Sequence, residues 1–168
     1  MLQQTQVKTV IPYFKKFTKK YKSLKSLSKI SEQKILKLWE GLGYYRRAKN
    51  LLATVKLLVK VYNSKLPNNL KEIKKLPGIG DYTSSAIMAI AFNEQFIPLD
   101  GNVERILKRV FYLKTDEEIS KNNLNRKKIF FGKSIRPSDY AQSIMEIGAL
   151  ICRPITVSYT HLTLPTSK

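Results

Sequence analysis

The 168-residue sequence is poor in cysteine, histidine and acidic residues, and it contains no long apolar run. Its single cysteine, Cys152, excludes an internal disulfide framework and any multi-cysteine metal site within this chain. Because no run of about 18 apolar residues occurs, a membrane span is not expected. The first ten residues lack the charged and apolar regions of a signal peptide, which favours the cytoplasm, with nucleoid association in a prokaryote.

The scarcity of negative charge points to the class of partner. Only 12 acidic residues accompany 31 lysines and arginines, and the formal net charge is +19. This excess favours a polyanionic partner, most simply nucleic acid. The alternative is that the lysine content reflects an AT-rich genome and that most of these lysines are only solvated. Charge alone does not separate DNA from RNA, or binding from catalysis.

Helical periodicity extends over nearly all of residues 1–151, which predicts an all-α fold. Pro12 predicts that one helix ends near Val10 and that another begins with Pro12 in its first turn. Ser138 is expected to cap a last helix that ends at Ile151. Further helices are predicted between Ser31 and Gly41, over 51–62, over 70–75 with Asn69 and Glu72 as a capping box, over 81–92, from about 102 to 112, and once within 114–137.

The chain is predicted to consist of a folded core, residues 1–153, and a tail, residues 154–168, that is disordered or foreign sequence. The stretch ITVSYTHLTLPTSK in this tail carries four threonines and the only histidine, His161. It continues no helical pattern, and although its alternation suits a strand, no partner strand is evident. We therefore assign no chemistry to His161.

The stretch LPGIGDYTSSA, from Leu76 to Ala86, places two glycines around Ile79 between two predicted helices. Glycine tolerates positive φ and close approach of another backbone, so Gly78 and Gly80 permit a hairpin over 76–80 whose amides all point outward. Such amides before a helix N-terminus bind phosphate without a side chain. The alternatives are a plain tight turn, or half of a dinucleotide fingerprint, which the missing strand and third glycine disfavour.

The order helix, LPGIG, helix and then LDGNVERIL resembles the helix-hairpin-helix DNA glycosylase superfamily. The segments MLQQTQVKTVIPYF and LWEGLGYYRRAKNL resemble its adenine DNA glycosylase family of the MutY type, which removes adenine mispaired with 8-oxoguanine. The resemblance covers about residues 1–153. It implies a helical barrel lobe with an incomplete iron–sulfur lobe, and double-stranded DNA with an A:8-oxoguanine or A:G mismatch as the partner. We expect a monomer.

Asp100 follows Pro98 at the start of a predicted helix, where an aspartate is either an ordinary N-cap or a functional carboxylate. Cleavage of an N-glycosidic bond leaves an oxocarbenium-like sugar that requires a nearby negative charge, and the base must first leave the stack. The resemblance implies that Asp100 is the catalytic aspartate and that Asn102 orients it. The alternative function is a non-catalytic helix-hairpin-helix module that only holds DNA.

Tyr82 matches the active-site tyrosine of the adenine glycosylases, whereas endonuclease III-like relatives carry a lysine there that forms a Schiff base. Tyrosine has no amine, so the resemblance implies a monofunctional glycosylase. An endonuclease III-like glycosylase and a half-buried helix tyrosine are the alternatives. Asp81 is an acid within the phosphate-binding turn, and we expect its carboxylate to point away from the phosphate.

Two further segments are implied to contact DNA. Leu2, Gln3, Gln4 and Thr5 resemble the segment that enters the duplex beside 8-oxoguanine, and Tyr44 matches a tyrosine that stacks next to the lesion. The basic residues that follow are either phosphate partners or a solvated helix face: Arg46, Arg47 and Lys49.

Some parts of the family pattern are missing from this sequence. Relatives read E-V-M-L-Q-Q-T, and their glutamate, which acts as acid and base, falls two residues before Met1, so we expect a truncated start and weak turnover. Cys152 matches the first ligand of a [4Fe–4S] cluster spaced C-x6-C-x2-C-x5-C. The cluster cannot assemble from this chain alone, since it needs four thiolates and the other positions hold Tyr159, Leu162 and Lys168. The 8-oxoguanine recognition domain is also expected to be absent.

Overall fold

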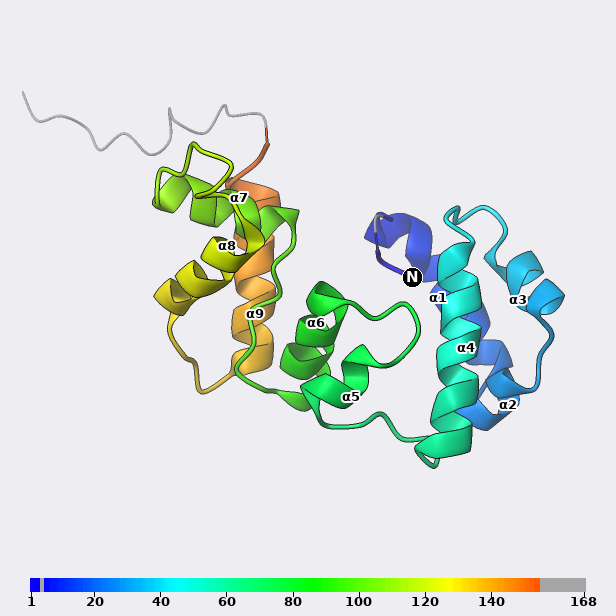
Figure 1. Cartoon of the computed structure of the whole chain (residues 1–168). Coiled ribbons are helices and arrows are strands. Elements are labelled where there is room, and N and C mark those ends of the chain that lie inside the picture. Colours follow the sequence, from blue (N-terminus) through cyan, green and yellow to red (C-terminus); the bar gives the residue numbers. More distant parts are fainter. Residues whose placement is uncertain (4, 155–168) are drawn as a thin grey trace, which may run out of the picture. The chain divides into compact units, whose positions relative to one another are not determined.

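The computed structural model describes residues 1–3 and 5–154, and every regular element in these ranges is helical (Figure 1). The chain divides into two compact units, Met1–Gly80 and Asp81–Lys168. The all-α prediction is therefore confirmed. Among the described helices, none has the length and apolar character needed to cross a membrane. The predicted tail lies outside the described residues from 155 onward.

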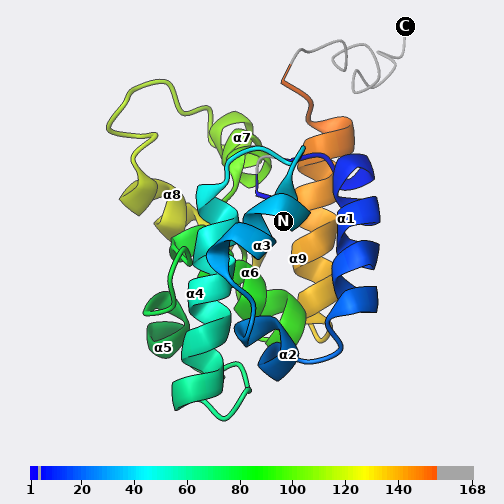
Figure 2. The same cartoon turned by 90° about the vertical axis from the view of Figure 1, so that its right-hand side faces the viewer.

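The first unit is built around its longest helix, α4, onto which α2 and α3 pack, while α1 contacts α3 (Figures 1 and 2). The predicted apolar stripe of α4 faces the core, because Leu52, Val55 and Leu58 are buried. Trp39 is 1% exposed and meets the ring of Phe17 edge-on at 6.2 Å. The helices of this unit are α1 (Val7–Lys20), α2 (Leu24–Ser28), α3 (Glu32–Trp39), α4 (Arg46–Val61) and α5 (Leu70–Lys74).

The predicted break at Pro12 is wrong, because α1 continues through it as one helix. Proline removes one backbone N–H and crowds the carbonyl four residues earlier, here that of Lys8. Pro12 lies on the exposed side of α1, whereas Val10 and Phe17 are buried. Water can therefore solvate the carbonyl that loses its partner, and burial of the apolar face keeps the helix continuous.

Two predicted helix starts are confirmed in the first unit. The hydroxyl of Ser31 accepts from the amide of Lys34 and caps α3. The side chain of Asn69 accepts from the amides of Lys71 and Glu72 and caps α5. Only the Asn69 half of the predicted capping box is present, because the Glu72 carboxylate accepts from the Tyr62 hydroxyl at 2.8 Å and pairs with Lys75. This contact joins the end of α4 to α5.

The second unit has a smaller core, formed by one face of α7 together with α8 and α9. The buried residues of this core are Val103, Ile106, Leu107, Leu124 and Ile144. Helix α6 packs on α9, and α7 packs on α9 and on the π turn that follows it. The elements are α6 (Asp81–Phe92), α7 (Gly101–Val110), α8 (Lys121–Lys127), the 3₁₀ turn η1 (Lys128–Phe131), α9 (Pro137–Glu146) and the π turn η2 (Ile147–Ile151).

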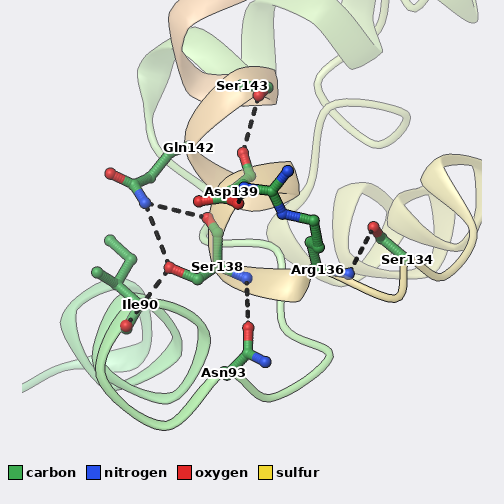
Figure 3. Close-up of polar contacts among 8 residues, drawn as sticks. All are labelled: Ile90, Asn93, Ser134, Arg136, Ser138, Asp139, Gln142 and Ser143. Atoms are coloured by element: carbon green, nitrogen blue, oxygen red, sulfur yellow. Dashed lines mark hydrogen bonds and ion pairs between the residues drawn. The ribbon is translucent and has the colours of Figure 1, made fainter.

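The predicted cap of the last helix is wrong. Helix α9 begins at Pro137, which suits the first helical position, so Ser138 lies inside the first turn. Figure 3 shows that the amide of Ser138 donates to Asn93 Oδ1 at 3.1 Å and that its hydroxyl donates to the carbonyl of Ile90. A side chain beyond the end of α6 therefore satisfies the N-terminus of α9, and this contact joins the two helices.

Candidate functional site

The carboxylate of Asp100 stands at the N-terminus of α7 and caps it. One oxygen, Oδ1, accepts from the amides of Asn102 at 3.0 Å and Val103 at 2.8 Å. The other oxygen, Oδ2, accepts from the Asn102 side-chain amide at 3.1 Å. Both oxygens are thus held, and Asp100 is at once an ordinary helix cap and a carboxylate with one fixed orientation.

The direction of the Asn102 side chain is set by Arg105, a residue that the sequence did not single out. Arg105 can only donate, and its Nη2 lies 2.8 Å from Asn102 Oδ1. The Nδ2 group of Asn102 must therefore face the carboxylate of Asp100, which accepts. Arg105, Asn102 and Asp100 form a directed chain of hydrogen bonds.

The same arginine anchors α7 to η2. Its Nη2 donates to the carbonyl of Gly148 and its Nε donates to the carbonyl of Cys152, both at 2.5 Å. Gly148 is buried, and a Cβ added there would lie 2.6 Å from the Cβ of Asn102 and 2.9 Å from its backbone. Only glycine lets η2 approach Asn102 this closely, so packing as well as hydrogen bonding fixes the asparagine.

Tyr82 lies in the first turn of α6 and is 36% exposed. Burial raises the pKa of its hydroxyl, and the negative charge of Asp100 raises it further. At neutral pH Tyr82 therefore presents a neutral hydroxyl near the carboxylate of Asp100. Of the three predicted catalytic residues, Asp100 and Asn102 are in direct contact, and Tyr82 is close enough to Asp100 to feel its charge.

The predicted hairpin over 76–80 is present, and its conformation follows from its residues. The amide of Ile79 donates to the carbonyl of Leu76 at 3.1 Å, with Pro77 second and Gly78 third at φ +76°. Proline second and a glycine of positive φ third define a type II turn. The prediction that all hairpin amides point outward is wrong for Ile79, because the turn itself uses that N–H.

Helix α4 holds the hairpin from beneath. Leu76 is 2% exposed, and the carbonyl of Pro77 accepts from the hydroxyl of Thr54 at 2.8 Å. A Cβ added to Gly78 would lie 2.5 Å from Asn50 Nδ2, whereas one added to Gly80 would meet nothing within 4 Å. Gly78 therefore faces the protein and Gly80 faces open space.

The predicted stacking residue, Tyr44, is 64% exposed and has a φ of +47°. The guanidinium of Arg47 lies 5.4 Å from its ring centroid. Leu2 is 58% exposed, and the hydroxyl of Thr5 accepts from Arg47 at 2.9 Å. The backbone carbonyl of Gln3 also accepts from Arg47, and Gln4 lies outside the described residues.

The basic residues after Tyr44 have different environments. Arg46 is exposed, and Lys49 forms an ion pair with Glu32 at 2.6 Å. Arg47 fits neither expectation, since its guanidinium bonds to protein acceptors from two segments. Burial lowers the pKa of Arg47, and the nearby Tyr44 raises it.

The expectation that the Asp81 carboxylate points away from a phosphate stays a prediction, and the structure shows only that its charge acts on Lys128. Lys128 is half-buried and donates to the carbonyl of Ile97 at 2.8 Å. Burial lowers the pKa of Lys128, while the charge of Asp81 raises it. The positive charge of Lys128, in η1, thus partly balances the negative charge of Asp81.

The sulfur of Cys152 is half-buried and accepts from Arg109 Nη1 at 3.1 Å. Across residues 1–3 and 5–154 no three His, Cys, Asp or Glu side chains gather into a group that could hold a metal ion. A [4Fe–4S] cluster is held by four thiolates, and the sequence has one cysteine. The residues present therefore do not fit the cluster.

Comparison with known proteins identifies the family. Residues 1–129 match the HhH-GPD superfamily base excision DNA repair protein family. The chain belongs to this superfamily. An adenine DNA glycosylase of Buchnera aphidicola subsp. Baizongia pistaciae is 44% identical over 158 residues, which cover 90% of the chain and 43% of the relative. That of Mus musculus is 37% identical, over 92% of the chain and 30% of the relative. The resemblance seen in the sequence is confirmed, and the chain spans less than half the length of these relatives.

Solved structures confirm the HhH-GPD fold. A thermostable thymine-DNA glycosylase matches with a TM-score of 0.81 and 25% identity, covering 94% of this chain and 73% of that protein. A trapped endonuclease III–DNA covalent intermediate matches with a TM-score of 0.81 and 21% identity, covering 92% and 72%. Two differently named proteins thus share this helical fold.

Proposed function

We propose that this HhH-GPD chain carries the active-site aspartate of an adenine DNA glycosylase, which hydrolyses the N-glycosidic bond of adenine mispaired with 8-oxoguanine or guanine. The observation that carries the proposal is the fixed carboxylate of Asp100, whose two oxygens are both held by Asn102. A cap for α7 needs only one oxygen. The additional bond, from the Asn102 side chain to Oδ2, fixes the orientation of the negatively charged carboxylate.

The chemistry requires a negative charge beside the anomeric carbon as the base departs and the sugar becomes cationic. Asp100 supplies that charge, and Asn102 prevents it from rotating away. Tyr82 contributes a neutral hydroxyl within electrostatic range of the carboxylate and cannot form a Schiff base. The arrangement therefore favours a monofunctional glycosylase.

DNA binding in this proposal relies on backbone amides and on the net charge of +19. Because the turn itself uses the amide of Ile79, the phosphate contact is assigned to the amides of Gly78 and Gly80. We expect a monomer bound to double-stranded DNA. Binding should weaken steeply with salt, since lysines that neutralise phosphates release counterions.

A non-catalytic DNA-binding module is the second candidate, favoured by the fact that Asp100 also serves as an ordinary helix cap. Two duplexes separate the candidates without requiring turnover. Each carries an abasic-site analogue opposite 8-oxoguanine, one a pyrrolidine with a protonated ring nitrogen and the other a neutral tetrahydrofuran. The pyrrolidine mimics the charge of the oxocarbenium ion.

The catalytic proposal predicts that the wild-type chain binds the cationic analogue more tightly than the neutral one, by on the order of 100-fold. Asp100→Asn should abolish this ratio and leave binding to tetrahydrofuran nearly unchanged. Asp116→Asn, which removes an exposed acid from the same unit, should keep the ratio. Equal binding of both analogues by the wild-type chain would favour the non-catalytic module.

A further inference from the structure

One guanidinium joins two segments that lie far apart in the sequence. Arg47 Nη1 donates to the carbonyl of Met1 at 2.7 Å, to the carbonyl of Gln3 and to the hydroxyl of Thr5 at 2.9 Å. Arg47 Nη2 donates to the carbonyls of Leu42 at 3.0 Å and Gly43 at 3.2 Å. The first set belongs to the N-terminal segment, and the second belongs to the loop that carries Tyr44.

The loop before Tyr44 has a conformation that needs support. Gly41, Gly43 and Tyr44 have φ values of +93°, +66° and +47°. Positive φ is unfavourable for a residue with a bulky side chain, so the surrounding structure must hold Tyr44 in place. This conformation leaves the ring of Tyr44 64% exposed.

Three side chains support this loop: Trp39, Tyr13 and Arg47. Trp39 Nε1 donates to the carbonyl of Gly43 at 3.1 Å, and the Tyr13 hydroxyl donates to the carbonyl of Glu40 at 2.8 Å. The guanidinium of Arg47 lies 5.5 Å from the Trp39 ring centroid and 5.4 Å from that of Tyr44. The guanidinium of Arg47 also bonds to Met1, Gln3 and Thr5.

The chemistry of these contacts requires arginine. A planar guanidinium presents donors on two nitrogens in a fixed fork and stacks on aromatic rings. A lysine ammonium keeps the charge but is a single point that cannot reach both carbonyl sets while lying against two rings. The adjacent Arg46 is exposed and carries the same charge.

We propose that Arg47 is the positioning residue of the lesion-reading surface, holding Met1, Gln3 and Thr5 and the Tyr44 loop in one fixed relation. This inference rests on the proposed function, in which both segments enter the duplex at the mismatch. Arg47 acts through the backbone of these segments rather than as a phosphate contact. Its loss should therefore lower the preference for damaged DNA more than the affinity for DNA in general.

The test compares Arg47→Lys with Arg46→Lys, and both variants keep the net charge. Only Arg47→Lys removes a guanidinium whose two terminal nitrogens bond to the two segments. Binding is measured by fluorescence anisotropy with an A:8-oxoguanine duplex and a matched A:T duplex. We expect Arg47→Lys to reduce the preference for the damaged duplex by about 10-fold, the scale of one lost base-stacking contact, and Arg46→Lys to retain it. In a Tyr44→Ala background, Arg47→Lys should add little.

Amide hydrogen exchange, measured without DNA, tests whether Arg47 holds the two segments in place. Arg47→Lys should speed exchange at Thr5 and at Tyr44 together, and emission from Trp39, the only tryptophan, should shift. Helix content measured by circular dichroism should stay the same. Unchanged exchange at both segments would overturn the inference, as would a preference that survives Arg47→Lys. A wild-type chain that binds both duplexes equally would overturn the proposed function instead, and exchange alone would then decide the inference.

Discussion

Each of the two units has an arginine that fastens a segment of the proposed site, but the two arginines control different properties. In the first unit Arg47 binds backbone carbonyls and the Thr5 hydroxyl, and what it fixes is the shape of an exposed surface. In the second unit Arg105 binds a side-chain amide, and what it fixes is the direction of the hydrogen bond that reaches Asp100. Arginine thus fixes the conformation of an exposed surface in the first unit and the direction of a hydrogen bond in the second.

The largest expected effect is that of Arg105→Lys. A lysine cannot donate to Asn102, Gly148 and Cys152 together, so buried carbonyls lose partners at about 1–3 kcal/mol each. We expect a loss of about 2–4 kcal/mol in urea unfolding monitored by circular dichroism. We also expect the preference for the pyrrolidine duplex to fall.

The matched control is Lys108→Met, which breaks a partly exposed ion pair with Glu104 on the same helix. Its effect should stay below about 1 kcal/mol. If both variants unfold at the same urea concentration, Arg105 does not anchor α7 in the way we describe.

The next effect is that of Gly148→Ala. The added Cβ meets the Cβ and backbone of Asn102 at under 3 Å, so α7 and η2 must separate. Overpacking of this kind costs about 1–3 kcal/mol, and it should also rotate Asn102 and weaken pyrrolidine binding. Gly101→Ala is the control, since its Cβ would meet nothing within 4 Å. Equal stability of the two variants, measured by thermal unfolding, would contradict the close packing.

In the first unit the two hairpin glycines allow effects on folding stability to be separated from effects on DNA binding. Gly78→Ala introduces a strained φ and a contact with Asn50, and we expect about 1–3 kcal/mol of destabilisation in urea. Gly80→Ala should leave stability unchanged and weaken DNA binding, since its Cβ projects where a phosphate would approach. Gly80→Ala with full affinity would remove Gly80 from the phosphate contact.

The smallest effect concerns Glu118, whose carboxylate accepts from the amides of Thr115 and Lys114. The Thr115 amide first, and then that of Lys114, lower the pKa of Glu118. Protection of these amides should be complete above the ordinary glutamate pKa of about 4.3, and it should be lost as pH falls through the lower pKa of the folded chain. Hydrogen exchange across this range tests it. Glu118→Gln should remove the pH dependence, and a wild-type chain without one would argue against the loop contact.

Local signals predicted much of this fold from the sequence. The capping side chains of Ser31 and Asn69, and the Pro-Gly pair of the hairpin, act within a few residues, so their effects are visible in the sequence. The predictions at Pro12 and Ser138 failed because distant packing decided them. Exposure of one helix face let α1 continue through Pro12, and Asn93 satisfied the end that Ser138 was expected to cap.

The residues that support the site were not predictable by the same reasoning. Arg47 follows the GLGYY stretch and Arg105 lies in LDGNVERIL, and in the sequence both resemble solvated basic residues on helix faces. Their acceptors lie more than forty residues away, at Met1 and at Gly148. A local pattern can indicate that Asp100 begins a helix, but it contains no information about which distant carbonyl will orient its neighbour.

The π turn at the end of α9 has a consequence for backbone register. In an α-helix the N–H of Cys152 would donate to the carbonyl of Gly148, but here it donates one residue further back, to Ile147, at 2.8 Å. That single-residue slip leaves the oxygen of Gly148 available to the arginine. Deleting one residue from 147–151 would restore regular winding and withdraw this acceptor. The orientation of Asp100 thus depends on a local irregularity in helical pitch about fifty positions downstream, which no comparison of side chains at the aspartate itself would reveal.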